Sequence, residues 1–354
     1  MIGERLLRAR SAAGLSMHQL GVIVGLSPNM IKKYEHNLHM PGSAMLLKLA
    51  QALQVRTEYF FRPWQVELKG IEYRKRGSTP ASLLKRIEAD VLDQAERWLE
   101  LANLWPEFPV GHYASPLTDV MVNTLDEIES LADQVRSTWE LGATPMTELI
   151  DILETHGILV IITDIGEQTR FDGLQAEIAG QPVIVVSANW PGDRQRFTLA
   201  HELGHLLLHG HLSPTLDEEK ACNRFASALL LPASSARHQL GTQRHHIEAR
   251  ELYLLKMEYG LSMAACLYRL VDLAIISTTL YKKMVIDFSR RGWRKTEPGL
   301  PYPSEKTFLF QQLVYRALGE GIVSESKAAE LLGISLSHFH QARKLEQLDA
   351  ATDQ

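Results

Sequence analysis

Two histidines and a glutamate lie close together in the stretch Phe197–His209, in the order H-E-x-x-H. His201 and His205 are four residues apart, so on a helix their imidazoles lie on one face, one turn apart. From that face both rings can hold the same metal ion. Glu202 follows the first histidine and can reach a water on that ion without being a ligand. The pattern predicts a zinc hydrolase site with Glu202 as the general base.

The residues around this motif indicate a helix. No proline interrupts the stretch, and apolar residues recur on the side opposite the histidines. A chance pentapeptide on a core helix is the competing interpretation. The apolar flank and a nearby candidate for a further ligand both argue against it. The leucines that bury the helix are Leu199, Leu203, Leu206 and Leu207.

A catalytic zinc site needs a third protein ligand and keeps one position open. His211 lies ten residues after His201, a spacing that requires a glycine at the seventh position, where Leu208 stands. His211 is therefore a weak candidate. Cys222 is chemically possible but is rarer beside this motif.

Glu219 is the favoured third ligand. It lies near the start of a predicted helix over Asp217–Leu231, so a second helix would present a glutamate to the two histidines. The result is a His-His-Glu set of the thermolysin type. Glu218 is the neighbour that could replace it. His209 and His211 are interpreted as solvated side chains or as partners of the ligands.

The length and composition are those of a soluble protein with two or three domains. The chain has 354 residues, of which 45% are hydrophobic and 22% are charged. No apolar run is long enough to cross a bilayer, and Met1 to Arg10 is predicted to be an amphipathic helix, not a signal peptide. With only Cys222 and Cys266, a disulfide framework is excluded and a cytoplasmic location is expected.

Charge is unevenly spread along the chain. Residues 1–62 hold eight basic and three acidic side chains, a net charge of +5, whereas the whole chain carries −5, which leaves −10 for the remainder. A small basic module joined to an acidic body suggests that the module alone binds nucleic acid. Its basic residues are Arg5, Arg8, Arg10, Lys32, Lys33, Lys48, Arg56 and Arg62.

This basic module has the pattern of a helix-turn-helix. A first helix is predicted over Ile2–Ala13, and Ser16 with Gln19 forms a capping box for the second. Gly25 makes the turn, and Ser27 caps a third, polar helix that runs to His36 and would enter the major groove. Two more helices are predicted around residues 44–53 and 58–61.

The module resembles the Cro/C1-like (XRE) helix-turn-helix family over about its first 65 residues. GLSMHQL (14–20), GLSPNMIKKYE (25–35) and LLKLAQALQV (46–55) carry the resemblance. It implies binding to double-stranded DNA, with a homodimer on a two-fold site. The residues expected to face the DNA are Ser27, Asn29, Met30, Lys32 and Lys33. Base-edge reading is assigned to Asn29 and Lys33, and phosphate contact to Ser27 and Lys32.

The middle of the chain changes from helical to α/β character. Apolar spacing predicts helices over 80–104 and near Leu117–Leu141, after a connector in which Trp64–Tyr73 forms a short strand. A helix over 146–155 precedes strands over 158–162 and 181–187, with a turn at Asp172-Gly173. A small sheet beside a metal helix can hold an extended peptide by main-chain hydrogen bonds.

The region from about Leu131 to Leu332 resembles the ImmA/IrrE family of metallopeptidases. QRFTLAHELGHLLLH (195–209) and EKACNRFASALLLP (219–232) carry the resemblance, with Phe171-Asp-Gly and LSMAACLYRL (261–270). It implies zinc, a cytoplasmic location and cleavage of helix-turn-helix repressors or antitoxins. Residue by residue it supports His201 and His205 as ligands, Glu202 as base and Glu219 as third ligand. Cys222 departs from the alanine usual there, which leaves ligation untouched.

The expected fold is α+β and mostly helical. Residues 1–65 form an all-α helix-turn-helix bundle and 66–130 a connector with a helical linker. Residues 131–245 form a gluzincin-like metallopeptidase core with a small sheet. Residues 246–354 form a helical region whose end, 324–343, repeats the helix-turn-helix rhythm in degenerate form.

Two classes of function remain open. One is a DNA-binding zinc endopeptidase that regulates transcription by cleaving a helix-turn-helix regulator in trans or its own chain in cis. The other is a regulator whose peptidase fold is a sensor or scaffold. Glu202 favours the first, since a scaffold has no need of the base. A stress or DNA-damage response, with single-stranded DNA as activator, rests on the resemblance alone.

Overall fold

The computed structural model describes residues 2–53, 55–62, 69–75, 80–117, 121–164 and 171–344. The chain divides into two compact units. The first unit comprises residues 1–69, 77–109 and 308–354, and the second comprises residues 70–76 and 110–307. The connector predicted as a strand over Trp64–Tyr73 is described only from Lys69, where strand β1 (Lys69–Lys75) begins; residues 63–68 and 76–79 lie outside the described part.

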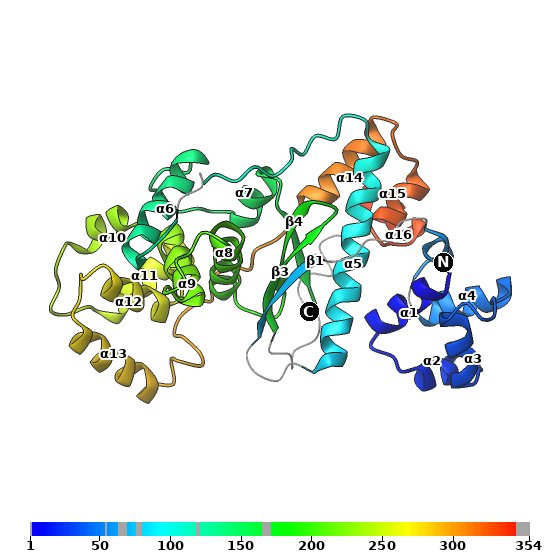
Figure 1. The fold of residues 1–354 in the computed structure, drawn as a ribbon, viewed down its shortest axis with the longest axis horizontal. Coiled ribbons are helices and arrows are strands. Elements are labelled where there is room, and N and C mark those ends of the chain that lie inside the picture. The colour runs from blue at the N-terminus through cyan, green and yellow to red at the C-terminus, as the bar shows by residue number, and fades with distance from the viewer. Residues whose placement is uncertain are drawn as a thin grey trace. The chain divides into compact units, whose positions relative to one another are not determined.

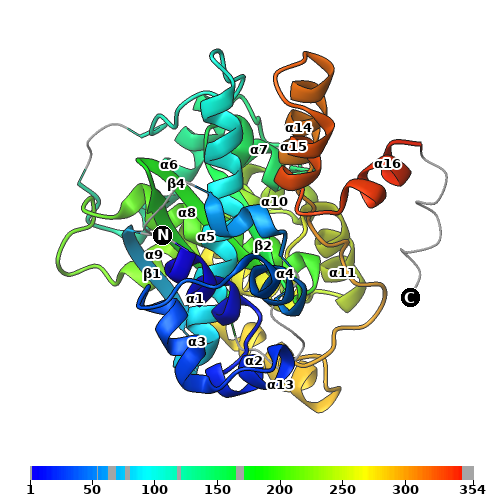
Figure 2. The same ribbon diagram turned by 90° about the vertical axis from the view of Figure 1, so that its right-hand side faces the viewer.

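The first unit is entirely helical among its described residues apart from the first residue of β1. Its N-terminal helices α1 to α4 cluster together in both views (Figures 1 and 2). The helices are α1 (Ile2–Ala12), α2 (Met17–Val24), α3 (Pro28–Glu35), α4 (Ser43–Ala52), the 3-10 helix η1 (Thr57–Phe61), α5 (Ala81–Leu104), α14 (Leu309–Gly319), α15 (Glu325–Leu331) and α16 (Leu336–Lys344).

Local capping explains why the N-terminal helices begin and end where they do. Ser16 and Gln19 form the predicted capping box at α2, and Gly25 ends that helix with a φ of 75°. The Ser27 hydroxyl accepts a hydrogen bond from the backbone N–H of Met30 and caps α3. These caps satisfy backbone groups that would otherwise have no helical partner.

Buried ion pairs join the N-terminal helices to α5 and α15. Arg5 and Arg8 of α1 both pair with Glu96 of α5, and the side chains of Arg5 and Glu96 are each only 2% exposed. Arg62 pairs with Asp93 of α5 at 3.2 Å and with Glu330 of α15 at 3.0 Å. Removing one partner of such a buried pair typically costs about 3–5 kcal/mol. The N-terminal and C-terminal helices are therefore parts of one folded unit.

The second unit contains a four-stranded sheet in the order β1-β3-β4-β2. β3 (Phe171–Ile178) runs antiparallel to β4 (Gln181–Ser187), and β2 (Leu159–Thr163) runs parallel to β4. The turn predicted at Asp172-Gly173 is wrong, because both residues lie inside β3 and Gly173 is paired with Val186. The chain instead reverses at Ala179 and Gly180, which both have positive φ.

Helices surround this sheet and carry most of the core. The helix predicted near Leu117–Leu141 is shorter than expected, and residues 118–120 lie outside the described part. The α+β, mostly helical fold class is confirmed. The helices are α6 (Leu125–Thr138), α7 (Leu149–Thr155), α8 (Gly192–Leu208), α9 (Glu218–Leu230), α10 (Ala233–Leu240), α11 (Ala249–Tyr259), α12 (Met263–Asp272) and α13 (Thr278–Arg290). None of the helices in the described ranges is long and apolar enough to span a membrane.

Helix α8 lies between the sheet and α9. It packs against β3 and β4 on one side and has its most extensive contact with α9 on the other. Gly204 makes the close approach of α9 possible, because a Cβ there would lie 3.2 Å from the Cα of Cys222. This close packing brings the start of α9 next to the H-E-x-x-H residues of α8.

Candidate functional site

The H-E-x-x-H residues lie on a helix that is almost completely buried. His201 has no exposed surface, Glu202 is 1% exposed and His205 is 8% exposed. The Nε2 atoms of the two histidines point at each other from consecutive turns and lie 3.0 Å apart. The Phe197 ring, one turn earlier on α8, is stacked on the His201 ring. The imidazoles are thus fixed by packing and not only by the backbone.

The start of α9 presents Glu219 to these histidines. Asp217 caps α9 by accepting a hydrogen bond of 2.9 Å from the backbone N–H of Lys220. The Glu219 carboxylate then lies 3.5 Å from Nε2 of His201 and 3.3 Å from Nε2 of His205. Its side chain is 63% exposed, so the cluster opens to solvent on the α9 side.

These three side chains fit a zinc ion. Their ligand atoms all lie within 4.8 Å of one another. A tetrahedral zinc with bonds of about 2.0–2.1 Å holds neighbouring ligand atoms about 3.3 Å apart. The two histidine nitrogens lie 3.0 Å apart, and the two carboxylate oxygens of Glu219 lie 3.3 Å from His205 and 3.5 Å from His201, which is close to that value. Two imidazoles and one carboxylate are also the donor set of a catalytic site with one position left open.

Glu218 contacts the other nitrogen of His205. Its Oε1 lies 3.1 Å from Nδ1 of His205 and 3.9 Å from Nδ1 of His209. A carboxylate on the remote nitrogen of a ligating histidine fixes the ring orientation and raises its basicity. The sequence had offered Glu218 only as a substitute for Glu219. The structure separates the two, since Glu219 faces both Nε2 atoms and Glu218 faces Nδ1.

The backbone of β3 passes directly beside Glu202. A Cβ placed on Gly173 would lie 3.5 Å from Oε1 of Glu202 and 2.6 Å from Cγ2 of Thr198. A larger residue there would have to push aside the Thr198 methyl group and the carbonyl of Val185, which favours glycine. The sequence pattern had assigned Gly173 to a turn, and the H-E-x-x-H spacing gave no sign of this contact.

The other candidates for the third ligand lie outside the cluster. His211 follows Gly210, and its carbonyl accepts a hydrogen bond from the backbone N–H of Val122 in a short bridge. Cys222 is a buried thiol packed against Gly204 at the interface of α8 and α9. Neither belongs to the group of converging ligand atoms found among the described residues.

Two hollows of the second unit share Phe197 in their lining. The larger, of about 800 Å³, is lined by Trp190, Thr198 and Trp293 among others. The smaller, of about 280 Å³, includes Asn223 of α9, one turn after Glu219. Both include Phe197, whose ring contacts His201. Concave surface that combines aromatic side chains with polar and charged groups is compatible with a ligand site.

A buried lysine, Lys256, is among the residues that line the larger hollow. Lys256 pairs with Glu297 at 2.8 Å and with Asp193 at 3.1 Å. Burial alone would lower the pKa of Lys256, but the two carboxylates raise it above its usual value. The ion-paired lysine ties α11 to the start of α8 and to the segment after α13.

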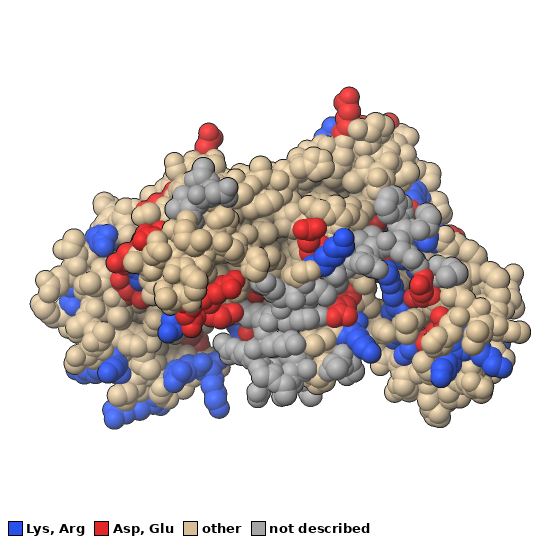
Figure 3. Space-filling model, viewed as in Figure 1, with Lys and Arg blue, Asp and Glu red and all other residues tan. Residues whose placement is uncertain are grey.

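Charges of opposite sign gather on different parts of the second unit. Figure 3 shows acidic side chains clustered over α9 and basic side chains over α13. Acidic surface around the cluster favours a bound cation. The basic residues of α13 and the segment after it are Lys282, Lys283, Arg290, Arg291, Arg294 and Lys295.

Helix α3 of the first unit presents the predicted DNA-binding residues. Asn29, Lys32 and Lys33 are exposed and occupy one face, because they are spaced three and four residues apart. Ser27 is exposed, but its hydroxyl already accepts the capping hydrogen bond, so only its proton is available to a phosphate. Met30 is half-buried and packs against the core of the bundle, so it offers less contact surface than expected.

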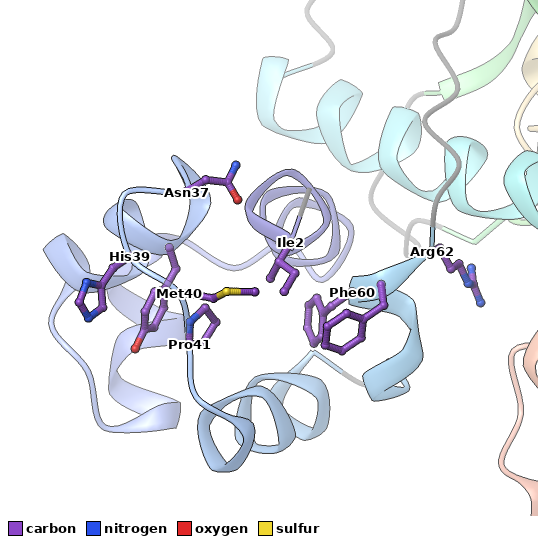
Figure 4. A pocket seen from close by; sticks show the side chains of 9 residues that line it. Ile2, Asn37, His39, Met40, Pro41, Phe60 and Arg62 are labelled. Atoms are coloured by element: carbon purple, nitrogen blue, oxygen red, sulfur yellow. The ribbon is translucent and has the colours of Figure 1, made fainter.

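A separate apolar pocket lies within this bundle. It has a volume of about 510 Å³ and is lined by Ile2, Met40 and Phe60, with Arg62 at its edge (Figure 4). Asn29, Lys32 and Lys33 do not line it. The polar face of α3 and this pocket are therefore two different surfaces.

Comparison with known proteins finds a match within each unit. The family model of the peptidase M78 family, described as an IrrE N-terminal-like domain, matches residues 153–271. A helix-turn-helix domain model matches residues 3–63. An uncharacterized HTH-type transcriptional regulator, y4wC, of Sinorhizobium fredii is 30% identical over 60 residues, which are 17% of this chain and 42% of that relative. The chain thus spans less than half the length of the curated relative it matches. Both resemblances inferred from the sequence are confirmed: the chain matches a helix-turn-helix domain model near its N-terminus and the IrrE N-terminal-like domain model of the M78 peptidase family in the middle of the chain.

Proposed function

We propose that the second unit is a zinc-dependent endopeptidase. His201, His205 and Glu219 would hold the metal, and Glu202 would be the general base. The observation that carries the proposal is the convergence of these three ligand atoms within 4.8 Å beside a buried glutamate. The match to a peptidase family over the same residues supports it.

Each residue of the site would have a separate role in peptide hydrolysis. When bound, zinc would supply Lewis-acid activation of water and of a peptide carbonyl at neutral pH. Glu202 would accept the proton of the attacking water and then pass it to the leaving amine. Glu218 would hold the His205 ring in orientation through Nδ1. Phe197 would cover one face of the His201 ring and would line the hollow that receives the polypeptide.

We further propose that the first unit directs this peptidase to DNA. The polar face of α3 would enter the major groove, with Asn29 and Lys33 at base edges and Lys32 at a phosphate. A homodimer on a two-fold site is the arrangement expected of this class of domain. The module carries +5 whereas the rest of the chain carries −10, which favours contact with DNA through the module.

The substrate we propose is a helix-turn-helix repressor or antitoxin cut in trans, or this chain cut in cis between residues 62 and 80. A peptidase fused to a DNA reader is placed where other repressors bind. A cytoplasmic stress or DNA-damage response, triggered by single-stranded DNA, is the setting suggested by the family resemblance. The alternative is a transcriptional regulator in which the peptidase-like domain senses or scaffolds without proteolysis; the HTH-type regulator found as a relative is compatible with both.

The peptidase proposal is tested with Glu202→Gln beside the wild-type chain. Both proteins should bind about one zinc per chain, because Glu202 is not a ligand. Only the wild type should cut a co-encoded helix-turn-helix protein or its own connector, with single-stranded DNA present or absent, as located by mass spectrometry. Equal cleavage by both proteins would exclude the assigned base. Cleavage by neither under any condition would leave the regulator as the function.

The DNA proposal is tested by two substitutions on the exposed face of α3. Lys32→Ala should weaken binding to all sequences and reduce the slope of log affinity against log salt by about 1. Asn29→Ala should cost about 1–3 kcal/mol and chiefly relax the sequence preference. Fluorescence anisotropy with the full chain over a range of salt concentrations measures both. Salt-independent binding would contradict a phosphate contact by the module.

A further inference from the structure

Strand β1 occupies an unusual position for a segment of connector. It consists of Lys69–Lys75 and is hydrogen-bonded to β3 at the edge of the sheet in the second unit. The residues before it, 1–69, and after it, 77–109, belong to the first unit. A short segment that connects two parts of the first unit thus forms the edge strand of the sheet in the second unit.

β3 lies directly beside the proposed base. Gly173 in β3 is the residue whose added Cβ would meet both Thr198 and Glu202 of α8. β2, at the opposite edge of the sheet, is separated from β3 by β4. An extended polypeptide that pairs with β3 would therefore run beside Glu202.

β3 has no open edge among the described strands. One edge pairs with β4, from Gly173 opposite Val186 to Ile178 opposite Gln181, and the other pairs with β1. Strand addition needs the backbone N–H and C=O groups of an exposed edge. A polypeptide can add to β3 only where β1 now lies.

We propose that β1 is an internal occupant of the substrate edge, and that an extended polypeptide substrate binds the peptidase by replacing it. The inference rests on the proposed peptidase function and adds its regulation. A tethered strand competes at a high effective concentration, so a substrate in trans meets a site that is already filled. The peptidase is restrained until β1 leaves β3, and the segment that restrains it is covalently continuous with the DNA-binding unit.

The test measures peptide binding, which requires neither zinc nor turnover. Two full-length proteins carry Glu202→Gln, and in one of them residues 69–75 are replaced by an equally long Gly-Ser segment, which keeps the tether but has little strand preference. The probe is a fluorescein-labelled peptide with the sequence of residues 69–75, KGIEYRK. Fluorescence anisotropy gives its affinity for each protein.

The protein with the Gly-Ser segment should bind the probe about tenfold or more tightly than the protein with β1 in place. Hydrogen exchange should show faster exchange of the β3 amides in that protein and restored protection when the probe is added. A probe with prolines at its third and fourth positions should not bind, since proline removes the donors of the ladder. Equal affinity of the probe for both proteins, or unchanged protection of β3, would overturn the proposal.

A second pair of variants covers the case in which the replacement disturbs folding. Neighbouring residues of an edge strand direct their N–H groups to opposite sides, so only one of Ile71→Pro and Glu72→Pro removes a hydrogen bond to β3. One of the two should bind the probe clearly better than the other. Equal binding by both would contradict the pairing. If the probe binds as expected and no Glu202-dependent cleavage is found, the peptidase function fails while the docking edge remains.

Discussion

Glu219→Ala and Glu218→Ala are adjacent substitutions with different expected effects on zinc. The Glu219 carboxylate lies 3.3 Å and 3.5 Å from the two histidine Nε2 atoms, so its removal would take away one of the three proposed ligands. Glu218 lies 3.1 Å from Nδ1 of His205, so its removal takes away only the partner of a ligand. Loss of such a partner weakens metal binding about 10–100-fold. We therefore expect that range for Glu218→Ala and a loss of more than about 100-fold for Glu219→Ala.

The difference in zinc affinity between the two variants can be measured as a difference in how much zinc stabilises the folded protein. At free zinc of about 1,000 times the wild-type Kd, binding stabilises the folded state by about 4.1 kcal/mol. The same zinc should stabilise Glu218→Ala by about 1.4–2.7 kcal/mol and Glu219→Ala by less than about 1.4 kcal/mol. Zinc competition with a chromophoric chelator gives the affinities, and denaturant unfolding with and without zinc gives the stabilisation. Without zinc the two variants should unfold alike, because both side chains are substantially exposed.

Two results would refute this assignment. Wild-type zinc affinity in Glu219→Ala would mean that Glu218, His211 or Cys222 completes the ligand set. A larger loss in Glu218→Ala than in Glu219→Ala would mean that the two carboxylates exchange roles when metal binds. His201→Ala, which removes a fully buried ligand, is the control that should abolish zinc binding in either case.

Two further predictions concern the packing around the site. Burial raises the pKa of Glu154 from 4.5 to about 8, so the folded state keeps a proton that the unfolded state releases, and stability should fall as pH rises from about 4.5 to about 8. This shift corresponds to a loss of about 4–5 kcal/mol in the free energy of unfolding over that pH range, and Glu154→Gln should abolish the loss. Urea unfolding at several pH values measures it, and an unchanged pH dependence in the variant would contradict the prediction. Gly204→Val should destabilise the fold by about 1–3 kcal/mol and weaken zinc binding, because the added atoms push α9 and Glu219 away from α8. Wild-type zinc affinity in that variant would show that the spacing of the two helices is not critical.

Features set by neighbouring residues could be predicted from the sequence. The capping box of Ser16 and Gln19 and the cap at Ser27 depend on residues three positions apart, so the pattern defines them. The same holds for His201 and His205, whose spacing places them on one helical face. The start of α9 near Asp217 was also predictable, whereas the approach of Glu219 to the histidines depends on the packing of α9 against α8. The metal-binding and catalytic roles of these residues stay predictions.

Features set by pairing between distant segments could not be predicted. Asp172-Gly173 has the composition of a turn, but pairing with β4 holds it in a strand. The choice between Glu218 and Glu219 depends on which carboxylate reaches which ring nitrogen, and the sequence does not contain that geometry. Nor does it show that β1 pairs with β3, since strand pairing across about 100 residues is a tertiary contact.

The division of the first unit into three chain segments determines what a cut in the connector would do. Residues 1–69 remain attached to residues 77–109 and 308–354 through the buried pairs of Arg5 with Glu96 and of Arg62 with Glu330. A single nick within β1 would therefore give two fragments that stay associated as a complex. Such a protein would run as two bands on a denaturing gel and as one species in native size-exclusion chromatography. Self-cleavage there would cut the chain without releasing the DNA-binding helices.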